Sequence, residues 1–239
     1  MKGSKTTKDA LIGYTGFVGS NLKKKKPNSD LFNSKNIHLI KKRKYNEIIF
    51  AGLPAEKWKA NKNPDKDLKN IKNLIKLLKT VKCNLIILIS TIDVHKTQET
   101  YGKNRKFFEN FVKKNFSKFL IIRLPAIFGK GLKKNILFDL LNNNQIENIN
   151  PKDKFQWFDL KFLYSEIKKI KTFNKIVELY SPPISNELII KKFKNLKLTK
   201  KNKKTIIYNY LPANGYYKNK KFMLDRIKVF IKNYKKFQL

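Results

Sequence analysis

The chain has 239 residues, of which 41% are hydrophobic and 13% aromatic, so it can bury a core and its composition excludes an intrinsically disordered protein. The formal net charge is +38, and Lys, spread along the whole sequence, supplies nearly all of the excess. Dense positive charge favours nucleic-acid binding. An even spread of Lys together with abundant Asn and Ile instead indicates compositional drift in an AT-rich genome, and we favour drift over a nucleic-acid partner.

The single cysteine, Cys83, excludes an internal disulfide and fits a reducing compartment. With one Cys and two isolated His residues, the sequence shows no metal-ligand spacing. No apolar run is long enough for a membrane helix or a signal peptide. We therefore expect a cytoplasmic protein that uses neither a metal nor a membrane.

Short apolar strands alternate with amphipathic helices through the first half of the chain. Strands are expected at 10–12, 30–32, 47–51, 85–90 and 119–123, and helices at 17–25, 67–79 and 105–115. Strands without polar alternation are typical of a parallel sheet covered by helices on both faces. Residues 1–130 are thus predicted to form a doubly wound α/β (Rossmann) domain.

The pattern loosens from residue 131 onward. Helices are expected at 135–141, 159–170, 184–196 and 222–234, and strands at 177–180 and 206–210. Residues 131–239 are predicted to form a smaller α+β substrate-binding region, packed against the first domain and partly interleaved with it.

The segment LIGYTGFVGSNL places glycines at 13, 16 and 19, between an expected strand and an expected helix. In a dinucleotide-binding turn, the first glycine allows the sharp turn, the second lets the backbone approach a pyrophosphate, and the third lets the helix pack on the strand. The following helix presents free N–H groups to the phosphates. We predict that NAD or NADP binds here, at Gly13, Thr15, Gly16, Phe17, Val18 and Gly19. The alternative is an ordinary tight turn.

The residue that reads the adenosine ribose should lie about 20 residues after the start of this motif. That position is Asn33, so no Asp or Glu is present there to bind a free 2′-hydroxyl. Ser34 and Lys35 would accommodate a 2′-phosphate, which favours NADP. The alternative is that Ser34 and Lys35 belong to an ordinary polar loop in a Lys-rich chain.

A second group of residues begins with Ser90-Thr91 and continues with Tyr101-Gly102-Lys103-Asn104-Arg105. With the glycine motif, Ala51-Gly52 and the RLPAIFG segment at 123–129, these residues resemble the extended short-chain dehydrogenase/reductase family, which includes nucleotide-sugar epimerases and dehydratases. The resemblance covers residues 9–135 well and the remainder faintly.

The resemblance implies that Thr91 holds a substrate oxygen and that Tyr101 is the general acid/base. It also adds Ala51, Gly52, Tyr101 and Arg105 to the cofactor-binding residues. The family has a Lys four residues after the Tyr, whereas this chain has Arg105. Arg keeps the positive charge that favours a phenolate, but its planar fork is not interchangeable with an ammonium group.

Four further residues are candidate substrate contacts: Lys57, Trp58, Asn135 and Gln156. Lys57 and Trp58 follow the end of an expected strand, where ligands bind in such sheets. Asn135 follows the segment at 123–129, and Gln156 lies in an aromatic cluster. Alternatively, these four residues only pack against neighbouring side chains or lie at the rim of the site.

The leading hypothesis is an NAD(P)-dependent oxidoreductase, or an epimerase or dehydratase, acting on a sugar or nucleotide-sugar by hydride transfer. The second hypothesis, motivated by Arg105, is a non-catalytic NAD(P)-binding sensor or partner protein. The third is a nucleic-acid binder driven by charge. The sequence is compatible with a homodimer.

Overall fold

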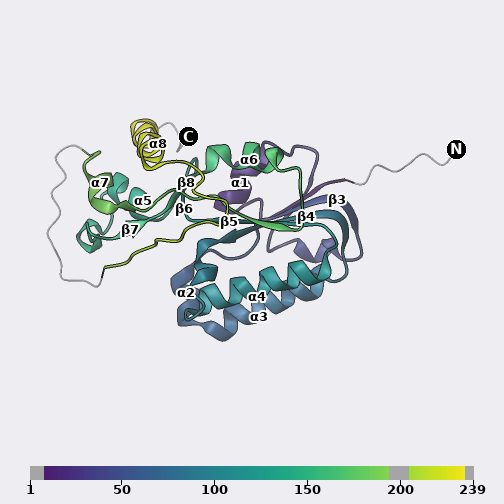
Figure 1. Ribbon diagram of the computed structural model, residues 1–239. Coiled ribbons are helices and arrows are strands. Elements are labelled where there is room, and N and C mark those ends of the chain that lie inside the picture. Colours follow the sequence, from purple (N-terminus) through teal and green to yellow (C-terminus); the bar gives the residue numbers. More distant parts are fainter. Residues whose placement is uncertain (1–7, 194–204, 235–239) are drawn as a thin grey trace. The chain divides into compact units, whose positions relative to one another are not determined.

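The computed structural model describes residues 8–193 and 205–234. These residues form two compact units, which are described separately (Figure 1). The first unit contains the described residues up to Arg123 together with Tyr164–Val177. The second contains Leu124–Leu163 and the described residues from Glu178 onward.

The first unit is built on a six-stranded sheet with the order β2-β1-β3-β4-β5-β9. Its strands are β1 (Ala10–Ile12), β2 (Asp30–Phe32), β3 (Lys44–Phe50), β4 (Lys82–Thr91), β5 (Phe119–Leu124) and β9 (Lys175–Glu178). The pairings β1–β2, β1–β3 and β3–β4 are parallel. The chain goes from β1 to β2 on one side and then crosses back to β3 on the other, so the strand order reverses between β1 and β3.

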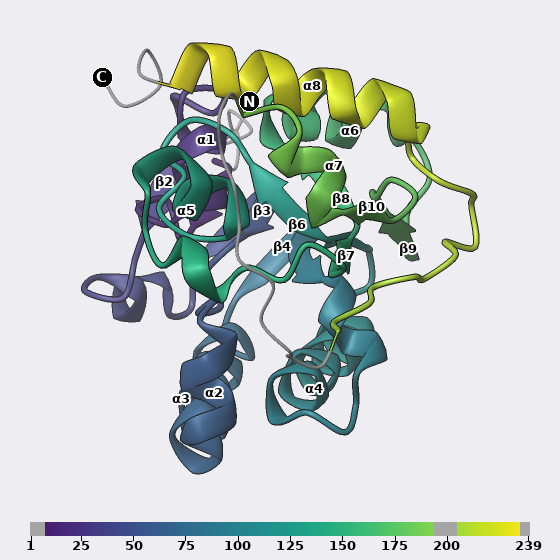
Figure 2. The same ribbon diagram turned by 90° about the vertical axis from the view of Figure 1, so that its left-hand side faces the viewer.

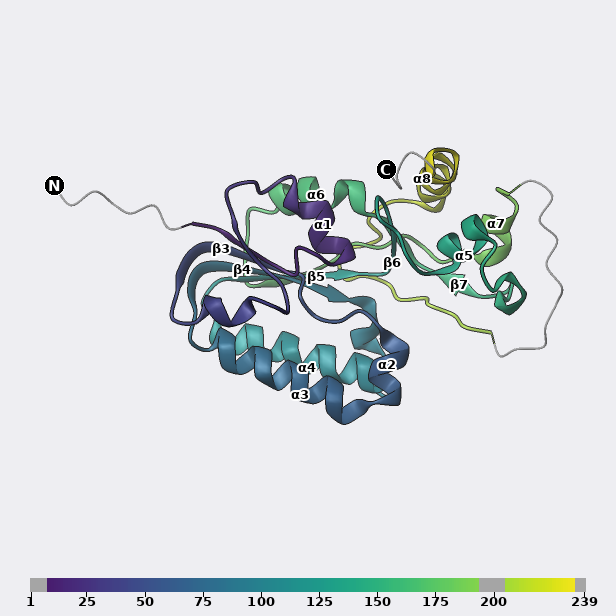
Figure 3. The ribbon, with the colours of Figure 1, turned by 180° about the vertical axis from the view of Figure 1, so that it is seen from behind.

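Helices cover both faces of this sheet. In Figures 1 and 3, α1 and α6 lie on one face, and α2, α3 and α4 lie on the other. The helices are α1 (Phe17–Lys23), α2 (Lys57–Lys62), α3 (Pro64–Leu78), α4 (Thr100–Asn115) and α6 (Leu163–Lys169), with 3₁₀ turns η1 (Ile37–Ile40) and η2 (Ile92–His95). The two helical layers explain the buried apolar runs within the strands, such as residues 48–50 of β3 and 86–89 of β4.

The core of the first unit lies where the central strands meet α3 and α4. Ile48, Ile86 and Phe108 are inaccessible to solvent there. Ile71 and Leu78 form the buried stripe of α3, and a polar residue, Asp67, lies on the same stripe.

The second unit contains short two-stranded pairs and three helices. Its strands are β6 (Ala126–Phe128), β7 (Lys154–Phe155), β8 (Trp157–Asp159) and β10 (Ile184–Ser185), and its helices are α5 (Ile136–Asn142), α7 (Asn186–Ile190) and α8 (Lys220–Asn233), with 3₁₀ turns η3 (Ile146–Asn148) and η4 (Leu160–Phe162). The β6–β8 pair is parallel and the β7–β10 pair is antiparallel. Helix α8 packs along β8 (Figure 2), and the rings of Phe128 and Phe230 lie 5.4 Å apart.

The doubly wound α/β fold predicted from the sequence is confirmed, and the five strands expected in the first half all form. Several details differ. Helix α2 and the short strands β6, β7 and β8 were not predicted, and the expected helix at 159–170 is α-helical only over Leu163–Lys169. The expected helix at 184–196 begins as β10 and is helical only over Asn186–Ile190, and residues 194–196 lie outside the described part. The expected strand at 206–210 makes one isolated bridge, between Lys154 and Ile207.

Within residues 8–193 and 205–234, no helix is both long and apolar enough to cross a membrane. The same residues contain no group of three or more His, Cys, Asp or Glu side chains arranged to hold a metal ion.

Candidate active site

The glycine turn begins at the end of β1 and contacts the end of β3. Gly13 has a φ of +86°, a left-handed conformation that side chains rarely adopt. A Cβ at Gly13 would lie 2.5 Å from the carbonyl carbon of Ala51 and 2.7 Å from the Cα of Gly52. The turn and the Ala51-Gly52 pair therefore meet backbone to backbone where the strand order reverses, which is where open α/β sheets bind ligands.

The other two glycines of the turn differ in what they contact. A Cβ at Gly19 would lie 2.6 Å from the carbonyl carbon of Gly13 and 2.9 Å from the Cα of Tyr14, so packing of α1 on the turn requires a glycine there. At Gly16 a Cβ would meet only the Gly13 carbonyl oxygen, at 3.3 Å. Gly16 also has an ordinary extended backbone, with φ −76° and ψ 167°. The internal packing of the chain therefore accounts for Gly13 and Gly19 but not for the exposed Gly16.

The residues after β2 lie beside the same turn. The Asn33 side chain donates from Nδ2 to the hydroxyl oxygen of Tyr14 at 3.2 Å, and its Oδ1 accepts from the backbone N–H of Lys35 at 2.9 Å. Ser34 and Lys35 are exposed. The structure thus brings the predicted ribose-reading segment to the predicted pyrophosphate turn.

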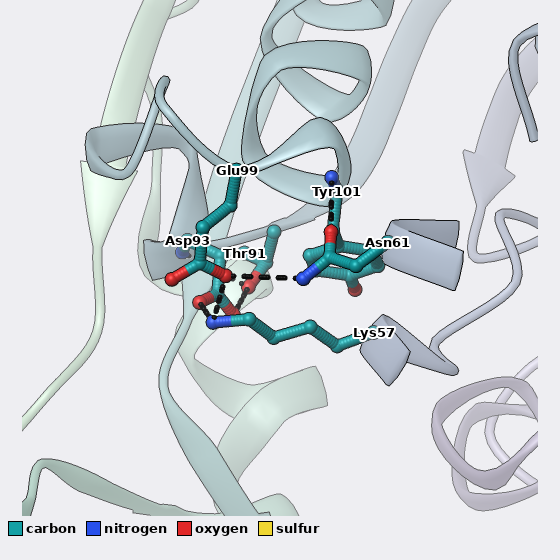
Figure 4. A network of polar contacts seen from close by, with 6 residues as sticks. All are labelled: Lys57, Asn61, Thr91, Asp93, Glu99 and Tyr101. Atoms are coloured by element: carbon teal, nitrogen blue, oxygen red, sulfur yellow. Dashed lines mark hydrogen bonds and ion pairs between the residues drawn. The ribbon is translucent and has the colours of Figure 1, made fainter. Parts of the chain in front are cut away.

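Thr91 ends β4 and begins η2, where its hydroxyl accepts a hydrogen bond from the backbone N–H of Asp93 at 3.2 Å. Lys57, at the start of α2, pairs with the Asp93 carboxylate at 2.9 Å and with the Glu99 carboxylate at 2.7 Å (Figure 4). Lys57 was predicted as a substrate contact, and in this structure two carboxylates neutralise it.

Asn61 of α2 connects this network to Tyr101. Glu99, the residue that precedes α4, makes no capping hydrogen bond with its side chain. Instead, Asn61 Oδ1 accepts from the backbone N–H of Tyr101 at 2.9 Å, and its Nδ2 donates to Glu99 Oε2 at 3.3 Å (Figure 4). An amide from a neighbouring helix therefore caps the first turn of α4 and fixes the backbone of Tyr101.

Tyr101 and Arg105 lie one turn apart on the buried side of α4. The guanidinium carbon of Arg105 is 4.3 Å from the centre of the Tyr101 ring, a cation–π geometry. Both side chains are buried. Burial raises the pKa of the Tyr101 phenol, and the negative charges of Asp93 and Asp67 add to that rise, while Arg105 opposes it. The net direction is upward, so the phenol is protonated at neutral pH.

Trp58, Asn135 and Gln156 are the remaining candidate residues. Trp58 is 64% exposed, with the Lys59 ammonium 5.4 Å from its ring centre. Asn135 and Gln156 belong to the second unit. Asn135 caps α5 through bonds from the N–H groups of Leu137 and Phe138, and the buried Gln156 bonds the backbone of Ser181 and Tyr210.

Sequence reasoning missed four polar residues that hold the site together: Asn61, Asp67, Asp93 and Glu99. Asp93 had a local signal, because a carboxylate two residues after a strand-ending Thr is typical of a short turn. Asp67 also had one, since it lies four residues before Ile71 on the apolar stripe of α3. Asn61 and Glu99 resemble the many other polar surface residues of the chain.

No family model matches the chain, and no curated protein matches it either. Solved structures do match in three dimensions. The enzyme WbmG of Bordetella bronchiseptica in complex with NAD and UDP matches with a TM-score of 0.76 and 10% identity, over 99% of this chain and 96% of that chain.

Two further structures match over most of their length. The UDP-N-acetylglucosamine 4-epimerase of Methanobrevibacter ruminantium gives a TM-score of 0.73 at 10% identity, covering 98% of this chain and 99% of that one. A dTDP-4-dehydrorhamnose reductase of Clostridium acetobutylicum gives 0.65 at 19% identity, covering 85% and 90%. The chain therefore has the fold of the extended short-chain dehydrogenases/reductases, as its motifs implied.

Proposed function

We propose that this chain is an NAD(P)-dependent enzyme of the extended short-chain dehydrogenase/reductase type that acts on a nucleotide-sugar. The observation that carries the proposal is Gly16. It is exposed on a turn where the strand order reverses, and the chain's own packing does not require a glycine there. A missing side chain at this place leaves the backbone open to a pyrophosphate.

The residues that would hold the dinucleotide come from three strand ends. Backbone N–H groups of Thr15, Phe17 and Val18 would bind the pyrophosphate, with Ala51 and Gly52 beside it, while the Gly16 N–H donates to the Gly13 carbonyl oxygen at 2.9 Å. Ser34 and Lys35, exposed after β2, would meet the adenosine ribose and favour a 2′-phosphate. A bound nicotinamide would supply or accept the hydride.

Tyr101 and Thr91 are the proposed catalytic residues. A phenol whose pKa is raised by burial is protonated near neutrality, so it is suited to donate a proton to a carbonyl oxygen as that carbon is reduced. The Thr91 hydroxyl would orient the same oxygen. The nucleotide-sugar class is supported by similar structures, which include complexes with UDP-glucose and with UDP and a dTDP-4-dehydrorhamnose reductase.

The experiment compares the parent protein with Tyr101→Phe and with the control Tyr164→Phe, on a panel of UDP- and dTDP-linked sugars and their keto forms with NAD(H) and NADP(H). Absorbance of the reduced nicotinamide and chromatography of the sugar nucleotide report turnover. Tyr101→Phe should abolish turnover and leave cofactor affinity nearly unchanged, while Tyr164→Phe should retain both. Unchanged turnover in Tyr101→Phe would refute the assignment.

A non-catalytic NAD(P)-binding role is the second candidate, and the partners of Arg105 favour it. Arg105 is hydrogen-bonded to Asp67 and Pro54 and is 2% exposed, so it does not supply the mobile cation expected beside an acid/base tyrosine. The same panel separates the two functions. Saturable cofactor binding without turnover of any sugar nucleotide would support the second.

A further inference from the structure

Asp67 and Arg105 form a buried ion pair between α3 and α4. Arg105 Nη1 donates to Asp67 Oδ2 at 2.9 Å, and Nη2 donates to Oδ1 at 3.1 Å. The side chains are 2% exposed for Arg105 and 7% for Asp67. Two parallel bonds of this kind fix the plane of a guanidinium as well as its position.

Asp67 has more partners than Arg105 alone. Asn104 Nδ2 donates to Asp67 Oδ2 at 2.9 Å, so consecutive residues of α4 bond to this one carboxylate. Asp67 occupies a place on the α3 stripe where Ile71 and Leu78 are buried, and a carboxylate there is costly without such donors. Its environment is therefore built around holding the second turn of α4.

Most terminal donors of the Arg105 guanidinium are already in use, because both N–H groups of Nη2 and one of the two on Nη1 bond to Asp67 or Pro54. Nη2 also donates to the Pro54 carbonyl oxygen at 2.7 Å. Nε is buried and has no hydrogen-bond partner among the residues that the structure describes. The guanidinium carbon, in contrast, lies over the Tyr101 ring, 4.3 Å from its centre.

The charges in this group oppose one another at the Tyr101 phenol. Arg105 lowers its pKa, whereas the carboxylate of Asp67 raises it and so reduces the effect of the cation. A lone lysine at position 105 would place an uncompensated positive charge beside the phenol. The pair does not.

We propose that Asp67 is a positioning residue for Tyr101, which holds the Arg105 guanidinium over the Tyr101 ring and partly offsets its charge there. The inference rests on the proposed role of Tyr101 and deepens it. Arg105 is then a fixed part of the scaffold and not a ligand of the cofactor ribose. A consequence is that Arg105→Lys alone does not raise turnover, because it leaves the buried Asp67 without its two-bond partner.

The test is an ultraviolet titration of the Tyr101 phenol, measured as the difference between each protein and the same protein carrying Tyr101→Phe. The key variant is Asp67→Asn, which keeps an acceptor oxygen and removes the charge. Asp65→Asn is the matched control, because it makes the same charge change on an exposed site of the same helix. Circular dichroism follows folding at each pH.

Removing the Asp67 charge should lower the pKa of Tyr101, which raises the phenolate fraction at a given alkaline pH. Asp65→Asn should leave that pKa unchanged. A folded Asp67→Asn protein with the parental Tyr101 pKa would overturn the proposal. If Asp67→Asn does not fold, the double variant Asp67→Asn, Arg105→Lys is compared with Arg105→Lys alone, and the same drop between these two proteins or its absence decides.

This titration needs neither cofactor nor substrate, so it can fail or succeed independently of the proposed function. Where a substrate has been found, the pH profile of kcat gives a second readout. Asp67→Asn should move the alkaline limb of that profile to lower pH without changing the Kd for the cofactor. A purely structural role for Asp67 would lower kcat at every pH alike.

Discussion

Arg123 of β5 donates to both carboxylate oxygens of Glu109 on α4, from Nε at 3.0 Å and from Nη2 at 2.7 Å. Ser90 of β4 donates to the same carboxylate at 2.7 Å, and Glu109 has no exposed surface. One carboxylate thus bonds two neighbouring strands to the helix that carries Tyr101. The RLPAIFG segment, recognised in the sequence by its family resemblance, begins with this arginine.

Breaking the ion pair between Arg123 and Glu109 should lower the stability of the protein. Glu109→Leu leaves the buried Arg123 cation without its carboxylate, and we expect the free energy of unfolding to fall by about 3–5 kcal/mol. Urea denaturation measures it. Glu56→Gln, which breaks an exposed pair with Lys59, serves as the control and should leave the urea midpoint unchanged. Equal effects of the two substitutions would contradict the structure.

The glycine turn predicts a sharp difference between two alanine substitutions. Gly19→Ala places a Cβ 2.6 Å from the carbonyl carbon of Gly13, and the backbone must move. It should lower the unfolding free energy by about 1–3 kcal/mol, as overpacking does. Gly16→Ala meets only one oxygen at 3.3 Å and should leave the melting temperature nearly unchanged. Calorimetry of both variants checks this, and similar melting temperatures would contradict it.

The capping of α4 by Asn61 predicts a loss of stability from an exposed residue. Asn61→Ala removes the acceptor for the Tyr101 N–H and should cost about 1 kcal/mol, the usual value of a helix cap. Asn73→Ala, at an exposed interior position of α3, should be neutral or slightly stabilising, since Ala favours a helix. Chemical denaturation distinguishes them. A neutral Asn61→Ala would show that the cap does not contribute.

A pH dependence follows from Lys26, which pairs with Asp9 at 2.8 Å and Glu47 at 2.6 Å. Burial acts to raise the pKa of Asp9, but the bond to Lys26 and its charge outweigh it, so the pKa lies below 3.8. Burial likewise acts to lower the pKa of Lys26, and the two carboxylates raise it above 10.5.

The directions of these two pKa shifts determine the pH range over which the ion pairs contribute to stability. The Asp9 contribution is complete above pH 3.8 and is lost as the pH falls through the lowered pKa of the folded protein. The Lys26 contribution is complete below pH 10.5 and is lost as the pH rises through its raised pKa. The stability difference between the parent and Lys26→Met should therefore be constant from pH 5 to 9 and shrink on both sides. A difference independent of pH would refute the pairing.

The strands and the glycine turn could be predicted because their signals are local. Leu11, Ile48 and Ile86 lie in runs without polar alternation, and burial under helices on both faces is the reason. Helix α2 could not be predicted in this way, since its only apolar residues are Trp58 and Ala60. It packs against α3 and α4, and tertiary contact determines its formation.

The polar contacts of the site were out of reach for a different reason. Asp67 and Arg105 are 38 residues apart. The apolar spacing of α3 marks the position of Asp67, but only the fold shows that Arg105 is buried and paired with it. Tyr101, Thr91 and Arg105 were found through the family resemblance, whereas their partners in η2, α2 and α3 belong to no motif.

The central claim is that the turn from Gly13 to Gly19 binds a nicotinamide dinucleotide. Its most direct measurement is fluorescence titration of the parent protein and of Gly16→Ala with NADH and NADPH. The account predicts saturable binding, tighter for NADPH, and a loss of about tenfold in affinity, or 1.4 kcal/mol, in the folded Gly16→Ala variant. No saturable binding of either dinucleotide, or equal affinities in the two proteins, would contradict it.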